Sequence, residues 1–426
     1  MKSSPTAITR RDSCRMCESS SLELVLPVVA SPIADAYLPS ERLGEQQDAY
    51  PLDLYLCNDC GHVQTLDVVD PDVLFRDYAY VTASSLGLVE HYRKYAEDIT
   101  AQFSLKPGAF ALEIGSNDGS LLNFFKAKGL KVLGIDPARR IAQDATLRGI
   151  PTLPEFFSST LAERLRKDYG PAAIVAANNV FAHADNLADI VLGVQTILDG
   201  DGLFIFEVSY LPDIIDRFLF DTIYHEHVSY HSILPLSKFL EKLGMQLFDV
   251  KRITSKGGSI RAFAQLLSTG RNAVDFRVTE MISEELQRGF NKSSVYREYS
   301  EAISARRTAV LKVVDDARAS GKTVAGYGAS TTVTTLIWNF DLSQKLDFLA
   351  DDNPTKHGLF APKCHLPVLP SEEIYSRRPN YIVILAWNYS EQIIRRHQRY
   401  LEEGGTFVIP LPVLRVITGS NSKLQP

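Results

Sequence analysis

The stretch FDTIYHEHVSYHS at residues 220–232 concentrates side chains that exchange protons near neutral pH. Histidine changes its charge nearest the working pH, and a carboxylate between two imidazoles can orient either of them. Loose solvated loops rarely gather such groups, so the pattern indicates a proton-transfer site. Its candidate residues are Tyr224, His225, Glu226 and His227.

The grouping of these side chains depends on the local structure. On a strand, His225 and His227 would share one face, opposite Tyr224 and Glu226, whereas a helix or turn would group them differently. For His225 alone, a buried ring satisfied by a backbone hydrogen bond is the favoured alternative, and the choice of base between the two histidines stays open. A metal site that also uses His231 is disfavoured, because base-catalysed chemistry here needs no metal.

A glycine-rich turn lies upstream, in AFALEIGSNDGSLLNFFKAKGLKVLGIDP at 109–137, which reads as strand, turn, helix and second strand. The glycines let the backbone approach a ligand closely, and the acidic end of the second strand can accept both hydroxyls of a ribose. The dinucleotide pattern GxGxxG is absent, whereas ExGxxxG with a later acidic strand end is similar to class I S-adenosylmethionine methyltransferases. An ordinary turn with structural glycines is the alternative. The candidate cofactor-binding residues are Glu113, Gly115, Asn117, Gly119 and Asp136.

The next apolar strand, AAIVAANNVFAHADN at 172–186, ends in Asn178, Asn179 and His183. Ligands of open parallel sheets lie at the carboxyl ends of the strands, so we expect this loop beside the cofactor. His183 capping a helix is the alternative. A further strand at 202–210 precedes the histidine-rich stretch, which therefore attaches to the same sheet edge.

A second β/α series follows a long charged helical region near 278–320. Its first strand leads into GYGAS, where Tyr327, Gly328 and Ser330 are candidate substrate-binding residues. The turn resembles a phosphate cradle, in which backbone amides and a helix N-terminus meet an anion. Glycines that serve packing are the competing interpretation.

Four of the five cysteines form two CxxC pairs near the N-terminus: Cys14, Cys17, Cys57 and Cys60. Four thiolates complete a tetrahedral shell and leave no position for a catalytic water, so the pattern predicts one structural Zn²⁺. Unrelated pairs of buried cysteines are the first alternative. A redox role is weaker still, because neither pair lies in a thioredoxin-like pattern. His62 is expected on the surface beside the second pair.

The whole chain has the length and composition of a multidomain α/β protein. It has 426 residues, which favours two or three domains, and we expect them at 10–70 (zinc-binding), 71–315 (methyltransferase) and 316–415 (Rossmann-like). The start lacks a signal-peptide core, and the longest apolar runs are too short to span a bilayer. The net charge is -6. We therefore expect a cytoplasmic protein, a monomer, that binds neither nucleic acid nor membrane.

Six motifs occur in this order along the chain: CxxC…CxxC, LEIGSNDGSLL, NNVFAH, YHEHVSY, GGSIRAF and GYGAS. With this combination the chain resembles, over nearly its whole length, the nucleotide-sugar C-methyltransferases that act on keto-deoxysugars. The resemblance implies a zinc-binding N-terminal domain, a central methyltransferase domain and a C-terminal Rossmann-like domain that binds the nucleotide sugar. It also implies a sugar site with His227 as the preferred base, lined by Tyr78 (or Tyr80, two residues on), His183, Tyr224, Glu226 and His227.

For such an enzyme we expect S-adenosylmethionine as methyl donor and a dTDP-linked 4-keto-6-deoxy sugar methylated at C3. His227 would remove the α-proton and Glu226 would hold its imidazole, while Tyr224 or His183 would donate to the enolate oxygen. The first alternative is an O- or N-methyltransferase, in which the stretch only orients a hydroxyl or amine. The second is a nucleic-acid-binding or -modifying protein, against which the acidic net charge argues.

Overall fold

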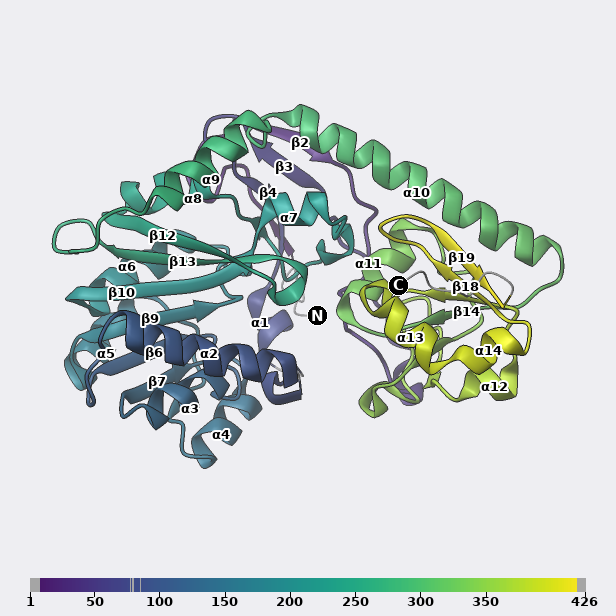
Figure 1. Cartoon of the computed structure of the whole chain (residues 1–426), viewed down its shortest axis with the longest axis horizontal. Helices are drawn as coiled ribbons and strands as arrows, with labels where there is room; N and C mark the ends of the chain where they lie inside the picture. The colour runs from purple at the N-terminus through teal and green to yellow at the C-terminus, as the bar shows by residue number, and fades with distance from the viewer. Residues whose placement is uncertain (1–7, 77, 79, 85, 420–426) are drawn as a thin grey trace, which may run out of the picture. The chain divides into compact units, whose positions relative to one another are not determined.

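The computed structural model describes residues 8–76, 78, 80–84 and 86–419, and Figure 1 follows its elements along the chain. Two compact units make up this part of the chain. The first consists of the segment that ends at Glu23, Tyr55–Ile214 and Glu226–Val295. The second consists of Leu24–Leu54, Ile215–His225 and the segment that begins at Tyr296. The domain limits expected after residues 70 and 315 stay a prediction.

A seven-stranded sheet forms the centre of the first unit, in the order β12-β13-β10-β9-β6-β7-β8. The neighbouring strands β10, β9, β6, β7 and β8 pair in parallel, whereas β13 is antiparallel to both β10 and β12. This order is that of the class I methyltransferase fold, so the predicted α/β class is confirmed. The strands are β6 (Phe110–Ile114), β7 (Lys131–Ile135), β8 (Thr152–Leu153), β9 (Ala172–Asn178), β10 (Leu198–Ser209), β12 (Met245–Ile253) and β13 (Ser259–Leu266).

Both faces of this sheet are covered by helices, because its central strands are apolar on both sides. In β6, Phe110, Leu112 and Ile114 join a core with α5, α6 and α8, whereas Ala111 joins a second core with α2 and α3. The alternation follows from the two-residue repeat of a strand. The helices are α2 (Leu86–Gln102), α3 (Ser120–Ala127), α4 (Arg139–Leu147), α5 (Ser159–Tyr169), α6 (Leu187–Ile197), α7 (Leu211–Asp216), α8 (Ile233–Lys242) and α9 (Phe276–Gln287).

Short strands surround the cysteine pairs. A four-stranded sheet has the order β11-β4-β3-β2, and a separate pair is formed by β1 and β5. The strand β11 comes from the histidine-rich stretch, so this sheet joins two distant parts of the sequence. The elements are β1 (Ile8–Arg10), β2 (Leu22–Leu26), β3 (Leu54–Cys57), β4 (Val63–Thr65), β5 (Asp67–Val69), α1 (Pro71–Phe75) and β11 (Ser229–Tyr230).

The second unit contains a six-stranded sheet in the order β16-β15-β14-β17-β18-β19. All neighbouring pairs are parallel except β18 with β19, so the second β/α series predicted from the sequence is confirmed. Its elements are β14 (Val324–Tyr327), α11 (Thr331–Asn339), β15 (Leu349–Asp351), β16 (Val368–Pro370), α12 (Glu373–Arg377), β17 (Tyr381–Ile384), α13 (Ser390–Arg396), α14 (Gln398–Glu402), β18 (Thr406–Ile409) and β19 (Arg415–Thr418). The helix α10 (Ser293–Ala319) continues from the first unit into this one. Within the described ranges, none of the helices combines the length and the apolar character that a membrane crossing requires.

Candidate functional site

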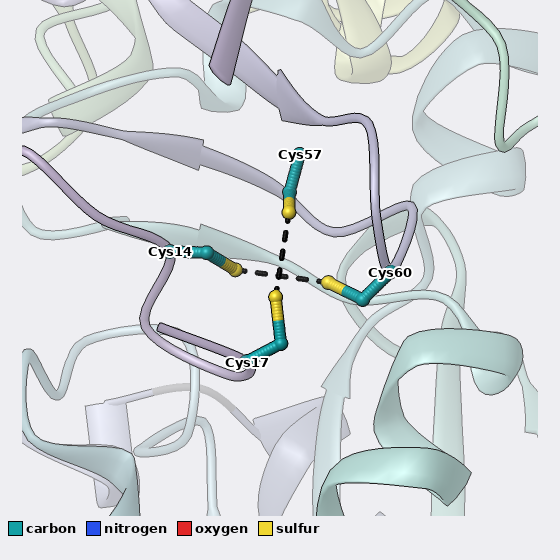
Figure 2. Close-up of side chains that lie close together, drawn as sticks. All are labelled: Cys14, Cys17, Cys57 and Cys60. Carbon is teal, nitrogen blue, oxygen red and sulfur yellow. Dashed lines mark hydrogen bonds between the residues drawn. The ribbon is translucent and has the colours of Figure 1, made fainter. Parts of the chain in front are cut away.

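The four cysteines converge on one point, as Figure 2 shows, although the two pairs are far apart in the sequence. Their sulfur atoms all lie within 4.8 Å of one another; Cys14 and Cys60 are 3.7 Å apart, and Cys17 and Cys57 are 3.5 Å apart. Four thiolates about 2.3 Å from a zinc ion have sulfurs about 3.8 Å apart, so the geometry fits tetrahedral Zn²⁺. The predicted zinc site is therefore confirmed in its ligand set.

The segment that carries the four cysteines and the strand β4, here called the zinc module, is hydrogen-bonded to the histidine-rich stretch. The pair of strands β4 and β11 matches Gln64 with Ser229, and the Thr65 N–H donates to the Val228 carbonyl at 3.1 Å. The Val228 N–H donates in turn to the Ala182 carbonyl at 2.8 Å. Val228 follows His227, and Ala182 precedes His183. A zinc ion bound by the four cysteines would therefore stabilise the strand β4, to which both of these histidine-bearing segments are linked by hydrogen bonds.

The expectation that His62 lies on the surface is wrong. Its side chain is fully buried, and its Nε2 lies 3.2 Å from the Ser229 hydroxyl. Its ring lies 5.6 Å from that of His231. Burial lowers the pKa of both histidines, that of His231 to about 4, so two neutral rings fill the space beneath β11.

A cavity of about 620 Å³ lies at the carboxyl ends of β6, β7 and β9. Volumes of this order hold small-molecule ligands. Gly115 lines it with a φ of +67°, and a Cβ at this position would come within 2.3 Å of Val180 Cγ2. No other residue type fits there, which agrees with a turn that brings backbone to a ligand. Of the residues predicted from the sequence, the cavity is lined by Tyr78, Gly115, Asn117, Asp136, Asn178, Asn179 and His183.

Asp136 directly follows β7 and accepts a hydrogen bond from the glycine-rich turn after β6. Its two oxygens accept from the N–H groups of Asn117, at 2.7 Å, and Ala138, at 2.9 Å. Burial raises the pKa of this carboxyl, while these two N–H groups oppose the shift. Asp136 therefore ties the first glycine-rich turn to the second strand and still presents carboxylate oxygens to the cavity, as a ribose requires.

Two residues of the ExGxxxG pattern support the cavity from outside its lining. Glu113 is buried, and its Oε1 accepts from Asn178 Nδ2 at 3.3 Å; burial raises the pKa of this carboxyl well above its usual range. Gly119 precedes α3 with a φ of +76°, and a Cβ there would come within 2.8 Å of Ile150. Both residues shape the turn that holds Asn117 and Gly115.

Two of the predicted catalytic residues, Tyr78 and His183, line this cavity, and each contacts one further predicted residue. The rings of His183 and His227 lie 5.0 Å apart, and the Tyr78 hydroxyl donates to Glu226 Oε2 at 3.2 Å. Phe75 stacks on His183 with centroids 5.7 Å apart. Burial, and then the charges of His227 and Lys256, lower the pKa of His183 well below its usual range. Its Nε2 is buried and has no hydrogen-bond partner within the described residues, so a neutral ring offers one nitrogen to a ligand.

The YHEH stretch forms a bend and a turn rather than a strand, so the alternation considered above does not apply. The division between the compact units falls inside it: Tyr224 and His225 belong to the second unit, and Glu226 and His227 to the first. His225 is buried and its Nε2 donates to the Tyr50 carbonyl at 3.2 Å. Burial lowers the pKa of His225 to about 4. This ring is thus neutral and engaged by the backbone of its own unit.

In the second unit, residues of the GYGAS turn form hydrogen bonds and close contacts with other residues of the same unit. The Tyr327 hydroxyl lies 3.0 Å from Asp352 Oδ1 and 2.9 Å from His397 Nε2. Gly328 has a φ of +118°, and a Cβ there would come within 2.9 Å of the Ala386 Cβ. Ser330 is exposed and precedes α11.

Sequence reasoning missed a buried charged group beside the sheet. Arg261 Nε donates to Glu207 Oε1 at 2.7 Å, His91 Nε2 lies 2.8 Å from Glu207 Oε2, and the Arg261 guanidinium lies 3.9 Å from the centre of the Tyr95 ring. It also assigned no role to Lys256, which lines the cavity. The signal was the motif GGSIRAF, which contains Arg261 and directly follows Lys256.

Comparison with known proteins accounts for nearly the whole chain. Family models match a zinc-binding domain at residues 14–75, a methyltransferase domain at 88–250 and a C-methyltransferase C-terminal domain at 254–412. The C-methyltransferase NovU from Streptomyces niveus is 34% identical over 412 residues, which are 96% of this chain and 98% of that protein.

Two similar solved structures each match part of the chain. Magnesium protoporphyrin IX methyltransferase (ChlM) from Synechocystis PCC 6803 with bound SAH is 15% identical, over 42% of this chain and 83% of that one, with a TM-score of 0.34. An S-adenosylmethionine-dependent methyltransferase from Clostridium acetobutylicum is 13% identical, over 42% and 92%, also with a TM-score of 0.34.

The zinc-binding cysteines, the cavity of the class I methyltransferase sheet and the full-length relative agree with one another. The cavity has a volume suited to a small molecule such as S-adenosylmethionine, and its lining includes the strand-end carboxylate of Asp136 and the turn at Gly115. The chain therefore belongs to the S-adenosylmethionine-dependent C-methyltransferases that carry a zinc-binding domain and a C-methyltransferase C-terminal domain.

Proposed function

We propose that the protein methylates C3 of a dTDP-linked 4-keto-6-deoxy sugar by way of an enolate. A carbon acceptor becomes nucleophilic only after it loses a proton, and a carbon beside a ketone loses one most readily. The observation that carries the proposal is the proximity of His183 and His227, 5.0 Å apart, to the bonded pair of Tyr78 and Glu226. The sugar, the nucleotide and the position rest on the family resemblance given by the sequence motifs.

In this proposal His227 removes the α-proton. Glu226, which accepts from Tyr78, holds the base in place, and the neutral His183 donates to the oxygen on which negative charge develops. When bound, S-adenosylmethionine supplies an electrophilic methyl group. A positioned base contributes about 10²–10⁴-fold, so alignment of the acceptor carbon with that methyl group must provide much of the remaining acceleration.

The two other groups of predicted residues complete the proposal. Tyr224 is a second candidate donor to the enolate oxygen, and Tyr327, Gly328 and Ser330 are proposed to contact the nucleotide-linked substrate. For His225, the bond to the Tyr50 carbonyl favours a supporting role over that of base.

The test is a panel of nucleotide-linked 4-keto-6-deoxy sugars incubated with the enzyme and methyl-¹³C S-adenosylmethionine. Carbon NMR of the product should place the label on C3, and the dTDP-linked substrate should react fastest. A parallel incubation in D₂O without methyl donor should exchange the α-proton. A methyl group found on oxygen or nitrogen, with no exchange, would overturn the proposal.

A further inference from the structure

Lys256 occupies the tip of the hairpin between β12 and β13. The tip residues Ser255–Gly257 form a short helical turn in which Lys256 has a φ of 51° and a ψ of 33°. This left-handed conformation is unfavourable for a residue with a Cβ and a long side chain. Backbone strain of this kind gathers at functional sites, where the surrounding structure maintains it.

The neighbouring contacts hold the strained tip in place. The Gly258 N–H donates to the Ser255 carbonyl at 3.0 Å, and the Ser259 hydroxyl donates to the same carbonyl at 3.1 Å. A Cβ at Gly258 would come within 2.6 Å of Asp213, which itself forms an ion pair with Arg252. The tip is therefore packed closely against α7, and the direction of the lysine is built into the fold.

Lys256 lines the cavity that also holds His183 and Tyr78. Its side chain keeps an exposed surface at the wall of the cavity. The protein atoms around it lower the pKa of its ammonium group, while the charges of Glu226 and Glu207 oppose the shift. Its charge in turn contributes to the lowered pKa of His183. The lysine thus lies among the groups assigned above to proton removal.

The cavity has two cationic side chains among its lining residues, and only one is already paired. Arg76 forms an ion pair with Asp72 at 2.7 Å and lies over the ring of Phe156. Lys256 has no ion-pair partner within 4 Å among the residues that the structure describes. A cation in a cavity wall without a fixed partner attracts negative charge on a ligand, because the surrounding protein screens the charges less than bulk water does.

We propose that Lys256 is a further catalytic residue, whose ammonium group binds the ketone oxygen of the substrate and stabilises the enolate. This proposal rests on the proposed function. As His227 takes the α-proton, the C–H electron pair becomes a carbon–carbon π bond and the carbonyl π pair moves to oxygen. Lys256 keeps its proton and donates a hydrogen bond to that oxygen throughout.

In the second step the α-carbon bonds to the methyl carbon as the bond from that carbon to sulfur breaks. The carbonyl then re-forms, S-adenosylhomocysteine leaves, and the proton held by His227 passes to solvent. Lys256 is unchanged at the end, so the step requires no further reactant. Lys256 would lower the barrier of both steps, because the substrate oxygen carries negative charge at the end of the first step and at the start of the second.

The experiment measures α-proton exchange in D₂O and methyl transfer for Lys256→Met and Lys256→Arg. Loss of one donor to a developing oxyanion costs about 10²–10³-fold, so Lys256→Met should lose about that much of both rates. Lys256→Arg keeps the charge and should retain clearly more activity than the methionine variant. Lys251→Met is the matched control, because Lys251 lies on the same hairpin but donates to Gln102, and it should react at the wild-type rate.

A second measurement separates loss of charge from loss of structure. In Lys256→Ala, added propylammonium should restore part of the exchange rate, which would not follow from a structural role. If wild-type enzyme methylates carbon and exchanges the proton, but Lys256→Met does both at the wild-type rate, the role of Lys256 is overturned and the proposed function stands. If wild-type enzyme itself neither exchanges nor methylates carbon, the proposed function fails instead.

Discussion

Two glycine-rich turns, each after the first strand of a parallel sheet, have different surroundings in this protein. In GSNDGS the carboxylate of Asp136 binds the Asn117 N–H at 2.7 Å, and the turn borders the cavity of about 620 Å³. In GYGAS the Ala329 N–H donates to Asp351 Oδ2 at 2.6 Å, and Gly326 is crowded by Leu349 and Leu385.

The difference shows what glycine spacing can and cannot predict. A glycine is required wherever another group comes close to the backbone, and that group can be either a ligand or a side chain of the same protein. In the second turn, an anion at the Ala329 N–H would meet the negative charge of Asp351. The cavity beside the first turn supports its proposed role in cofactor binding. The role of the second turn in substrate binding stays a proposal, which experiments on each unit can test.

The largest difference expected between the two units is their dependence on metal. Structural Zn²⁺ contributes roughly 10–16 kcal/mol in isolated zinc-finger peptides, so Cys57→Ser should lose the metal, the fold around β3 and β4, and activity. Elemental analysis should find one zinc per wild-type chain, and calorimetry should show a lowered transition for the variant. Cys364→Ser is the control, since this cysteine lies outside the cluster. A metal-free variant with wild-type stability would refute the assignment.

The second largest effect is expected at the base. Loss of a positioned base costs about 10²–10⁴-fold, so His227→Ala should lose most α-proton exchange while cofactor affinity stays nearly unchanged. His225→Ala is the matched variant within the same motif and should be milder, because its ring is held by the Tyr50 carbonyl. Exchange and methyl transfer are followed in parallel. The reverse ranking of the two variants would make His225 the base.

The third effect concerns pH and the second unit. Burial raises the pKa of Asp221 to about 7, although Trp387 Nε1 donates to its Oδ2 at 2.8 Å. Because the folded state holds this proton more tightly than the unfolded state, stability from this group is present below about pH 4 and is lost as the pH rises to about 7. Asp221→Asn should remove that slope, by at most about 4 kcal/mol. Denaturant unfolding at several pH values measures it, and an unchanged slope would contradict the burial argument.

The smallest effect expected is on cofactor affinity at the two turns. A charge-assisted hydrogen bond to ribose contributes about 1.5–3 kcal/mol, so Asp136→Ala should weaken S-adenosylmethionine binding by about 10- to 100-fold. Asp351→Ala, at the corresponding strand end of the second sheet, should leave it unchanged. Calorimetric titration of both variants compares the turns directly. Equal losses, or no loss at Asp136, would remove the distinction between them.

The sequence predicted the sheets well, because buried parallel strands appear as short apolar runs that end in glycines or polar residues. The glycine-rich turn and each CxxC pair were recognised because their spacing is local, and the two cysteine pairs, although far apart in the sequence, together supply the four ligands of one zinc ion. The chemistry of YHEH was inferred from its residue types, but its turn conformation was not predicted. The strand that follows it, Ser229–Tyr230, has only two residues and leaves no alternating pattern that would mark where the turn ends.

The missed residues depend on distant contacts. His62 was expected on the surface beside the second cysteine pair, yet it is buried, and its Nε2 lies 3.2 Å from the hydroxyl of Ser229, 167 positions later. Lys256 lies in a polar loop, TSKGGS, that resembles any hairpin tip. Its left-handed backbone and its place in the cavity wall distinguish it, and in the sequence only its position directly before the motif GGSIRAF could have pointed to it.

The pairing of β4 with β11 has a consequence for how the enzyme matures. During synthesis the four cysteines emerge by residue 60, whereas the Ser229 partner of His62 comes 167 residues later, or about 10–30 s at ordinary translation speeds. The zinc-binding segment can therefore fold before His227, the proposed base, has been made. His227 would then be positioned when β11 pairs with the already folded edge of β4. In a chain made without zinc, we expect that edge, and with it the position of the proposed base, to be less well defined.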